Sequence, residues 1–388
     1  MPTLQEALKA SGGIVNRGGL PLRFGDVDDE ENALREGAAL TPISWRGVLE
    51  VTGKDRIRFL HNATTNDVFK LVTGREGGSI GKDEKLDLAA TPSGLGQFSV
   101  IPNRQGKMVA DIRLRLLEDR AWVDLDRGSV SNTVTTLGGM VVSEDVQIKD
   151  RSKEFDLLRV DGPKAREVLA KALGTIPDLP DWHFARIGDV LVSPFAITGA
   201  PGYDLQVPAA ASGDLWTKLV AAGAKPCGFF AMETGRVENG FPRWVADMDG
   251  TVLPMEAGLD PIAISYSKGC YLGQEVIQRV KTYSEAPRAL VQVAIDPRPP
   301  GKEGGPVPTP NPGTAVLVEK DTVGRVTSLA WSRKFQGLIA LALVKKEHKA
   351  EGTKVVLDAG GAPYTGRVRP LPWHAKFAPA AAPTPISK

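Results

Sequence analysis

One segment brings a thiol, an amine and two glycines together: S-Y-S-K-G-C-Y-L-G-Q-E-V-I-Q-R-V, residues 265–280. The apolar positions after residue 275 predict a helix, and we expect it to begin at Cys270. There a thiol would meet unpaired amides and the positive end of the helix dipole, with Lys268 as a nearby cation; these effects favour the reactive thiolate. Gln274 and Glu275 can point back at the same turn. The other interpretation is a buried structural cysteine on a well-capped helix.

The second cysteine, Cys227 in K-P-C-G-F-F, has no such surroundings and is predicted to be a small core residue. Two cysteines and four histidines exclude a disulfide framework and a multi-cysteine zinc module, and no metal site is predicted. His61 is expected to be an ordinary surface or core histidine.

Composition excludes several classes of protein. The 388 residues include 48 Lys and Arg and 46 Asp and Glu, a net charge of +2, which is too balanced for a nucleic-acid coat or a polybasic membrane binder. With 42% hydrophobic and 24% charged residues the chain is not disordered as a whole. The start is polar and no apolar run reaches the ~18–20 residues that cross a bilayer, so a soluble cytoplasmic protein is expected.

Proline and glycine mark the expected domain boundaries. Residues 1–40 read as an irregular arm with one short helix, residues 296–313 as a Pro/Gly-rich linker loop, and residues 373–388 as a disordered tail. Residues 314–372 predict short strands with few helices, hence a small antiparallel barrel or sandwich.

A weak internal repeat precedes the linker. L-E-V-T-G-K-D-R-I-R-F-L at 49–60 aligns with L-R-V-D-G-P-K-A-R-E-V-L at 158–169. Both read as a strand, a glycine turn and a helix, which indicates two similar α+β modules; the alternative is a chance match of a common pattern.

These residues also resemble a known family. K-G-C-Y-L-G-Q-E at 268–275 resembles the signature of the YgfZ-like folate-binding family, which is related to the glycine cleavage T-protein, an aminomethyltransferase. Similar segments follow in family order: F-L-H-N-A-T-T-N-D-V at 59–68, T-G-A-P-G-Y-D-L at 198–205, M-E-T-G-R-V-E-N-G at 232–240, L-P-M-E-A-G-L-D at 253–260 and V-G-R-V-T-S at 323–328. The resemblance implies an α+β fold: a folate-binding region of intertwined α+β modules around a central cavity at 41–285, then a C-terminal antiparallel β-barrel.

Departures from the T-protein pattern favour the YgfZ-like branch. In N-R-Q-G-K-M-V-A-D-I, Ala110 stands where the T-protein has the first of two acids, and only Asp111 remains. Ala200 stands where the resemblance places a pterin-binding acid, and alanine cannot accept hydrogen bonds from a pterin edge. Cys270 is gained relative to the T-protein.

The resemblance implies that tetrahydrofolate lies in the central cavity with Cys270 at its edge. Cys270, Lys268 and Asp111 are the predicted catalytic residues. Asp111 and Arg236 would also orient the folate, and Glu238 would replace the lost pterin partner. The full predicted folate-binding set is Asn66, Asp67, Tyr203, Arg236, Glu238, Tyr271, Gln274 and Glu275. Simpler roles stay open: capping or a turn for Asn66 and Asp67, an ion pair of Arg236 with Glu233, a solvated face for Glu238 and core packing for Tyr203.

Three functions stay open at this point. The first, favoured by the resemblance, is a folate-binding accessory factor in iron–sulfur cluster assembly or repair that supports iron–sulfur enzymes, including some that modify tRNA. Its expected partners are folate and iron–sulfur client or assembly proteins, with no direct nucleic acid and no membrane. One cysteine cannot hold a cluster alone, so any contact with a cluster would be shared or transient. The second is an aminomethyltransferase or related one-carbon transferase, and the third is a non-catalytic binding module.

Overall fold

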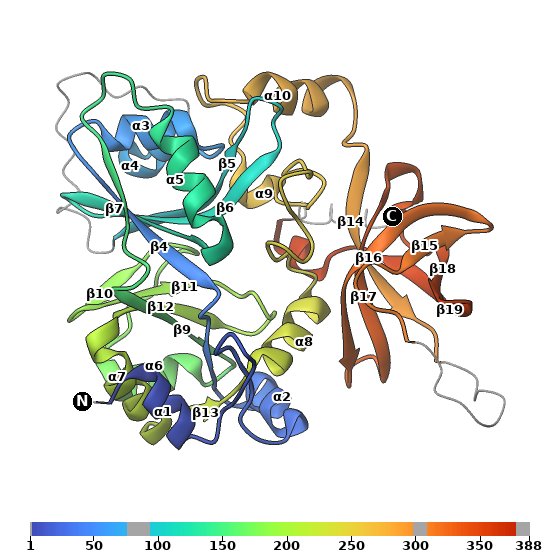
Figure 1. The fold of residues 1–388 in the computed structure, drawn as a ribbon, viewed down its shortest axis with the longest axis horizontal. Coiled ribbons are helices and arrows are strands. Elements are labelled where there is room, and N and C mark those ends of the chain that lie inside the picture. The colour runs from blue at the N-terminus through green and yellow to red at the C-terminus, as the bar shows by residue number, and fades with distance from the viewer. Residues whose placement is uncertain (1, 76–93, 298–308, 378–388) are drawn as a thin grey trace, which may run out of the picture.

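The protein is described here as a computed structural model, in which residues 2–75, 94–297 and 309–377 are placed. Figure 1 shows two α+β modules stacked on one another, with a barrel beside both of them. Most of the linker predicted at 296–313 lies outside the described residues. No helix in the described part of the chain is long and apolar enough to cross a bilayer.

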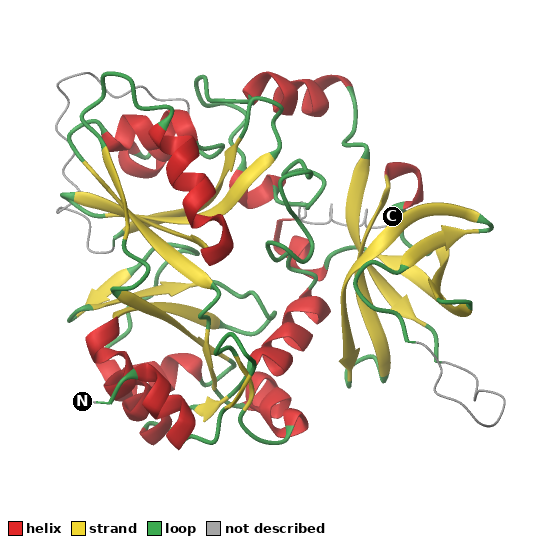
Figure 2. Ribbon diagram, viewed as in Figure 1, coloured by secondary structure: helices red, strands yellow, loops and turns green. Residues whose placement is uncertain are grey.

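The first module is a five-stranded antiparallel sheet with three helices on one face (Figures 1 and 2). In order across the sheet, its strands are β5 (Leu95–Pro102), β6 (Met108–Leu116), β7 (Arg120–Asp126), β4 (Arg46–Thr52) and β8 (Gln147–Asp150). Its helices are α3 (Arg56–Ala63), α4 (Val68–Thr73) and α5 (Val130–Gly138), and a 3₁₀ turn at Arg127–Ser129 leads into the last of them.

The second module is a six-stranded sheet, again with helices on one face. Its strands, in order, are β10 (Ala185–Ile187), β11 (Val190–Pro194), β12 (Gly202–Pro208), β9 (Phe155–Asp161), β3 (Ala39–Pro42) and β13 (Lys225–Pro226). Only the pairing of β13 with β3 is parallel. The helices that share its core are α1 (Leu4–Ala10), α6 (Ala165–Leu173) and α7 (Ala209–Ala221).

The two sheets face each other, with the helices on the outside (Figure 2). Side chains alternate along each strand, so every strand has one face toward its helices and one toward the other sheet. On β6, Ile112 and Leu114 join the helical core, whereas Arg113 and Arg115 face the second sheet. The layer between the sheets therefore contains a charged network beside a hydrophobic cluster that includes Val48, Trp122, Leu157 and Leu191.

The predicted repeat is confirmed in space. Strand β4 runs into α3 through Gly53, and β9 runs into α6 through Gly162, each glycine with a positive φ. A Cβ at either glycine would collide with a backbone carbonyl, of Asp145 or of Gly37. The glycine is needed at the same point of both modules because another segment of backbone crosses there.

The C-terminal part is a closed six-stranded antiparallel barrel, which resolves the choice between barrel and sandwich. Around the barrel the strands are β14 (Arg288–Ile295), β17 (Gly337–Lys345), β16 (Asp321–Ser332), β15 (Ala315–Val318), β18 (Lys354–Ala359) and β19 (Ala362–Arg369). A 3₁₀ turn at Lys346–His348 follows β17. The predicted start at residue 314 is too late, because β14 lies before the linker and pairs with both β17 and β19.

The two ends of the chain are more ordered than predicted. Residues 1–40 contain two helices, α1 and α2 (Val27–Glu36), and the small ribbon β1 (Ile14–Val15) and β2 (Pro21–Arg23). Leu4 and Leu8 of α1 are buried in the core of the second module, so this segment is part of that module. At the other end Pro372–Phe377 form a 3₁₀ helix with Trp373 buried, so a tail starting at 373 is predicted too early.

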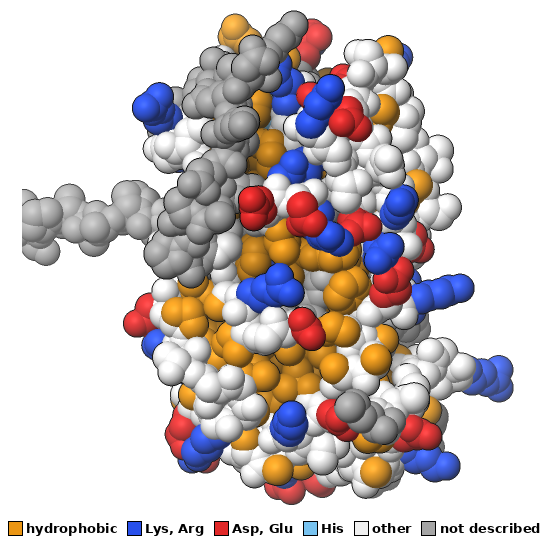
Figure 3. Space-filling model, turned by 90° about the vertical axis from the view of Figure 1, so that its left-hand side faces the viewer, with side chains coloured by type: hydrophobic (Ala, Val, Ile, Leu, Met, Phe, Trp, Pro, Cys, Tyr) orange, Lys and Arg blue, Asp and Glu red, His pale blue; other side chains and the backbone are white. Residues whose placement is uncertain are grey.

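Three further helices connect the modules to the barrel: α8 (Phe229–Asn239), α9 (Asp260–Ala263) and α10 (Gln274–Tyr283). Helix α8 lies between the second module and the barrel in Figure 1, and its contacts include β16 and β17. The opposite side of the molecule, seen in Figure 3, is where the edges of the two sheets meet. Hydrophobic side chains gather across the middle of that face.

Candidate functional site

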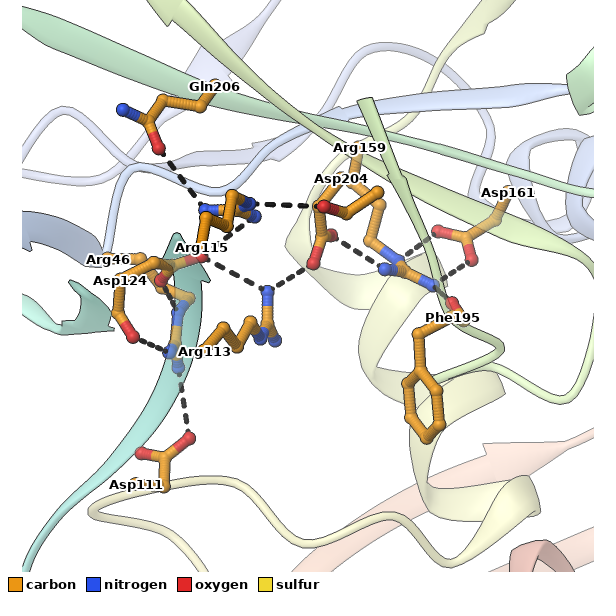
Figure 4. Close-up of polar contacts among 11 residues, drawn as sticks. Arg46, Asp111, Arg113, Arg115, Asp124, Arg159, Asp161, Phe195, Asp204 and Gln206 are labelled. Atoms are coloured by element: carbon orange, nitrogen blue, oxygen red, sulfur yellow. Dashed lines mark hydrogen bonds and ion pairs between the residues drawn. The ribbon is translucent and has the colours of Figure 1, made fainter. Parts of the chain in front are cut away.

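The centre of the molecule is a network of arginines and aspartates held between the two sheets (Figure 4). From the first sheet, Arg113 on β6 donates from Nη1 to Asp204 Oδ2 at 2.5 Å, across to β12. Arg46 on β4 pairs with Asp124 and places Nη1 3.2 Å from Asp111 Oδ2. Alternation along β6 and β7 sends these side chains to the same face, so the charges meet where the sheets pack.

The second sheet contributes the other half of the network. Arg159 on β9 donates from Nη1 to Asp204 Oδ1 at 2.7 Å and from Nη2 to Asp161 Oδ1 at 2.8 Å. Its Nη2 also donates to the carbonyl of Phe195 at 2.5 Å. Burial alone would raise the pKa of Asp204, but Arg113 and Arg159 outweigh it and hold that pKa at about 2. Asp204 is therefore charged, whereas burial raises the pKa of Asp161 in spite of its pairing with Arg159.

A small cavity lies against this network. It leaves about 30 Å³ for the centres of water molecules, which is room for one or two waters. Its charged lining consists of one acid, Asp111, and five arginines: Arg46, Arg113, Arg159, Arg236 and Arg243. Aromatic side chains complete the wall, namely Trp45, Phe241 and Trp244. The bicyclic ring of a pterin does not fit this cavity in the form described.

Asp111 has the one carboxylate oxygen on this wall that lacks a hydrogen bond. Its Oδ2 is paired with Arg46, whereas Oδ1 is buried and accepts no hydrogen bond from the described residues. Ala110, its neighbour on β6, is completely buried on the other face of the strand, in the core of the first module. An unpaired buried carboxylate oxygen is unfavourable unless a ligand or water supplies a donor.

Arg236, predicted to bind folate, has no N–H free. It donates to both carboxylate oxygens of Glu233, to Asp247 Oδ2 at 2.6 Å, to the carbonyl of Phe241 and to Ser328 Oγ at 2.7 Å. Those bonds use all five donors of a guanidinium. Because Ser328 belongs to β16, the hydrogen bond from Arg236 connects α8 to the barrel. The ion pair with Glu233, left open by the sequence, is present.

The Lys268 side chain is engaged with backbone. The buried Lys268 ammonium donates to the carbonyl oxygens of His61, Thr64 (2.6 Å) and Asn66 (3.0 Å). Burial lowers the pKa of Lys268 to about 7. Cys270 is exposed and lines none of the described cavities. The three donors of the lysine are thus used by backbone carbonyls, and an effect of its charge on the thiol stays a prediction.

The predicted helix start at Cys270 is wrong. Helix α10 begins at Gln274 with Gly273 as its N-cap, so Cys270 lies in the loop before it. A Cβ at Gly273 would collide with the carbonyl of Asn103, and the residue has a φ of 75°. This glycine of the motif therefore permits close approach of another backbone segment, the turn at 103–106, and not of a ligand.

Asn66 and Asp67 hold local structure together. Asn66 Nδ2 donates to the carbonyls of Phe98 and Ile262, each at 2.8 Å. Asp67 is the N-cap of α4 and accepts from the Lys70 amide at 2.8 Å. Its Oδ1 lies 3.4 Å from Nδ1 of the buried His61, whose pKa burial and Lys268 lower to about 4, so this histidine is neutral at pH 7.

The remaining predicted residues are dispersed. Tyr203 packs on the core of the second module, on the face of β12 opposite Asp204. Tyr271 is buried under the Lys268 ammonium, with its ring centre 4.9 Å from Nζ. Gln274 Nε2 donates to the carbonyl of Lys268 at 3.4 Å, and Glu275 is exposed. Glu238 lies on α8 in a separate pocket. Of the predicted residues, only Asp111 and Arg236 line the central cavity.

The sequence interpretation missed most of the central network. A visible signal was M-V-A-D-I-R-L-R-L at 108–116, where charged residues alternate with apolar ones on a predicted strand. Such alternation normally indicates a solvated face. The charges could be recognised as buried only by knowing that a second sheet, with Arg159 and Asp204, covers that face.

Comparison with known proteins places the chain among its relatives. Residues 85–268 match the GCVT N-terminal domain, and residues 288–374 match the glycine cleavage T-protein C-terminal barrel domain. An aminomethyltransferase of Symbiobacterium thermophilum is 29% identical over 96% of both chains. One of Exiguobacterium sibiricum is 27% identical over 90% of this chain and 91% of its own.

A solved structure shows the same fold. The crystal structure of glycine cleavage system aminomethyltransferase T from Bartonella henselae is similar with a TM-score of 0.77 and 21% identity, over 95% of this chain and 96% of that one. The similarity extends through both modules and the barrel. The chain therefore carries the GCVT N-terminal domain and the T-protein C-terminal barrel domain, in the T-protein fold.

Proposed function

We propose that this chain is a tetrahydrofolate-dependent one-carbon transferase of the T-protein type, acting on an aminomethyl group. The observation that carries the proposal is the unpaired, buried Oδ1 of Asp111 on the wall of the central cavity. Full-length relatives named aminomethyltransferase support it. This function was the second hypothesis from the sequence, and it now stands first.

The chemistry of the cavity wall suits a folate, although the volume of the cavity is too small for one. A pterin offers adjacent N–H donors, which a carboxylate accepts, and the aromatic wall suits a flat ring. The cavity must widen first. Arg243, with a side chain 25% exposed and bonds of 3.3 Å to Glu233, is the least constrained arginine of the lining. Because the pterin ring does not fit the cavity, we assign no chemical step. Arg46 pairs with one oxygen of Asp111, which leaves the other oxygen to accept a hydrogen bond from a ligand.

Asp111→Asn should weaken tetrahydrofolate binding by about 10- to 100-fold in calorimetry, because a hydrogen bond to a charged group contributes roughly 1.5–3 kcal/mol. The matched control is Asp189→Asn, in the exposed turn between β10 and β11, which should bind like wild type. No heat from the wild type would refute folate binding. Formation of methylene-tetrahydrofolate from an aminomethyl-lipoyl carrier distinguishes a transferase from a binder.

A second candidate is the iron–sulfur accessory role of the YgfZ-like branch. It is supported by the K-G-C-Y-L-G-Q-E segment and by the exposure of Cys270, which a partner protein could reach. On this hypothesis Cys270 is one ligand or nucleophile shared with a client, because a cluster usually needs four ligands.

Cys270→Ser should then abolish complementation of iron–sulfur enzyme activity in a strain that lacks the protein, while tetrahydrofolate binding stays unchanged. Cys227→Ala is the control, since that thiol is buried and donates to the carbonyl of Lys225. Full rescue by Cys270→Ser would exclude the accessory role for this thiol.

A further inference from the structure

A second and larger pocket lies on the other side of α8. Its volume is about 440 Å³, within the usual size for small-molecule sites. Residues 232 and 236 of α8 face the central cavity, whereas Ala231, Thr234, Gly235 and Glu238 face this pocket. Helix α2 forms the opposite wall, residues 198–201 form one end, and Lys334 and Pro372 come from the barrel side.

Small residues keep the pocket open. Gly199, Ala200, Ala231 and Gly235 all belong to its lining. A Cβ on Gly235 would lie 3.0 Å from Cβ of Thr198. A larger residue at position 235 would therefore crowd Thr198 in this wall. The two family-like segments at 198–205 and 232–240 therefore meet at this pocket.

The inner wall carries a negative charge without a full partner. Glu31 of α2 is only 5% exposed, and its Oε2 accepts no hydrogen bond from the described residues. Arg35 Nη2 is 3.5 Å from that oxygen and donates to Glu238 Oε1 at 2.9 Å. Glu238 also accepts from Ser332 Oγ at 2.6 Å. One cation thus serves two buried acids, and Glu31 is left short of a donor.

Burial raises the pKa of Glu31 above its ordinary value, although the Thr234 hydroxyl and the Arg35 guanidinium act in the opposite direction and Glu238 adds a smaller upward contribution. A ligand that brings a positive charge and N–H donors would reverse that effect. At the outer edge lies Lys334, which is exposed and has no ion pair among the residues described. The pocket thus has an acid inside and, at its exposed edge, a cation whose ammonium lies 5.7 Å from the centre of the Phe335 ring.

We propose that this pocket binds a small zwitterion, with a protonated amine on Glu31 and a carboxylate on Lys334. The amine would supply the hydrogen bonds that Glu31 Oε2 lacks, and the carboxylate would stay at the solvent-facing rim. The pocket is separate from the central cavity, so this proposal does not depend on folate binding there.

Calorimetry with glycine, β-alanine, 4-aminobutyrate and 5-aminovalerate varies the spacing between amine and carboxylate, with butylamine and butyrate as single-charge probes. We expect at least one zwitterion to bind more tightly than either single-charge probe. Glu31→Gln should weaken that zwitterion at least tenfold, because it removes the charge from the pair. Lys334→Gln should weaken it several-fold and leave butylamine unaffected.

Two controls isolate the site. Glu36→Gln changes an exposed acid at the end of the same helix, and Asp111→Asn changes the central cavity; both should bind the zwitterion like wild type. Thermal unfolding of each variant shows whether it is folded. No heat from any zwitterion, or equal affinity in Glu31→Gln, would overturn the proposal. Butylamine binding as tightly as every zwitterion would overturn the role of Lys334.

Discussion

Replacing Arg159 with methionine should lower the free energy of unfolding by about 3–5 kcal/mol, or prevent folding, as expected when one partner of a buried charge network is removed. Arg159 is completely buried and pairs with Asp161 and Asp204. Methionine removes the arginine that Asp161 and Asp204 share, so that, among the described residues, Asp204 keeps only Arg113 as an ion-pair partner. The carbonyl of Phe195 likewise keeps only the amide of Ile197. Chemical denaturation followed by circular dichroism measures the loss.

Arg186→Met is the matched control, since Arg186 is exposed on β10 of the same sheet and should change stability by less than about 0.5 kcal/mol. Adding Asp161→Asn to Arg159→Met should recover part of the lost stability, because it neutralises one stranded carboxylate. If the free energy of unfolding of Arg159→Met lies within about 1 kcal/mol of the wild-type value, the network does not stabilise the packing of the two sheets.

The same network bears on function. Asp204 pairs with arginines of both sheets, whereas Asp111 pairs with Arg46 of the first sheet. A ligand that needs Asp204 competes with Arg113 and Arg159 for its oxygens, whereas one that binds Asp111 Oδ1 breaks no hydrogen bond of that oxygen, although the cavity must still widen. Asp111 is therefore the residue through which binding is most easily tested.

The parts of the fold predicted correctly from sequence are those determined locally. The strand–glycine–helix repeat and the barrel strands β15 to β18 follow from patterns of a few residues, such as the glycines at 53 and 162, whereas β19 was not predicted. The first barrel strand was missed because β14 is separated from its partners by the linker, and its pairing with β17 and β19 depends on contacts more than 40 residues away.

The site was harder to predict, because its side chains are arranged by distant partners. Lys268 lies two residues from Cys270 in sequence, but three backbone carbonyls at 61–66 attract its ammonium inward. Arg236 was expected to face a ligand, and Asp247 and Ser328 take its donors instead. In each case a charged side chain satisfies buried polar groups that no local pattern reveals.

Lys268→Met should lower the free energy of unfolding by roughly 3 kcal/mol, because three buried carbonyls lose a donor at roughly 1–3 kcal/mol each, partly offset by no longer burying an ammonium. These carbonyls belong to the 61–66 segment, so Lys268 joins two parts of the chain about 200 residues apart. The side chain is thus a positioning group for both family-like motifs. Denaturant unfolding at pH 7 measures the loss.

The pH dependence separates this role from simple packing. The pKa of Lys268 is about 7 in the folded protein and 10.5 in its ordinary state. The unfolded chain therefore binds this proton more strongly between those values, and the wild type gains stability as pH rises through that window. Lys268→Met lacks this gain, so the difference between the two proteins should widen from pH 7 to pH 10.

Two control substitutions complete the test. Lys218→Met removes an exposed lysine from α7, and Cys270→Ser changes the exposed thiol in the same loop; both should stay within about 0.5 kcal/mol of wild type at every pH. Because Lys268 donates to backbone, Cys270 in Lys268→Met should be alkylated at a rate within about twofold of the wild-type rate, at a pH where both proteins are folded. A large fall in that rate would restore the lysine as the thiol's activating cation.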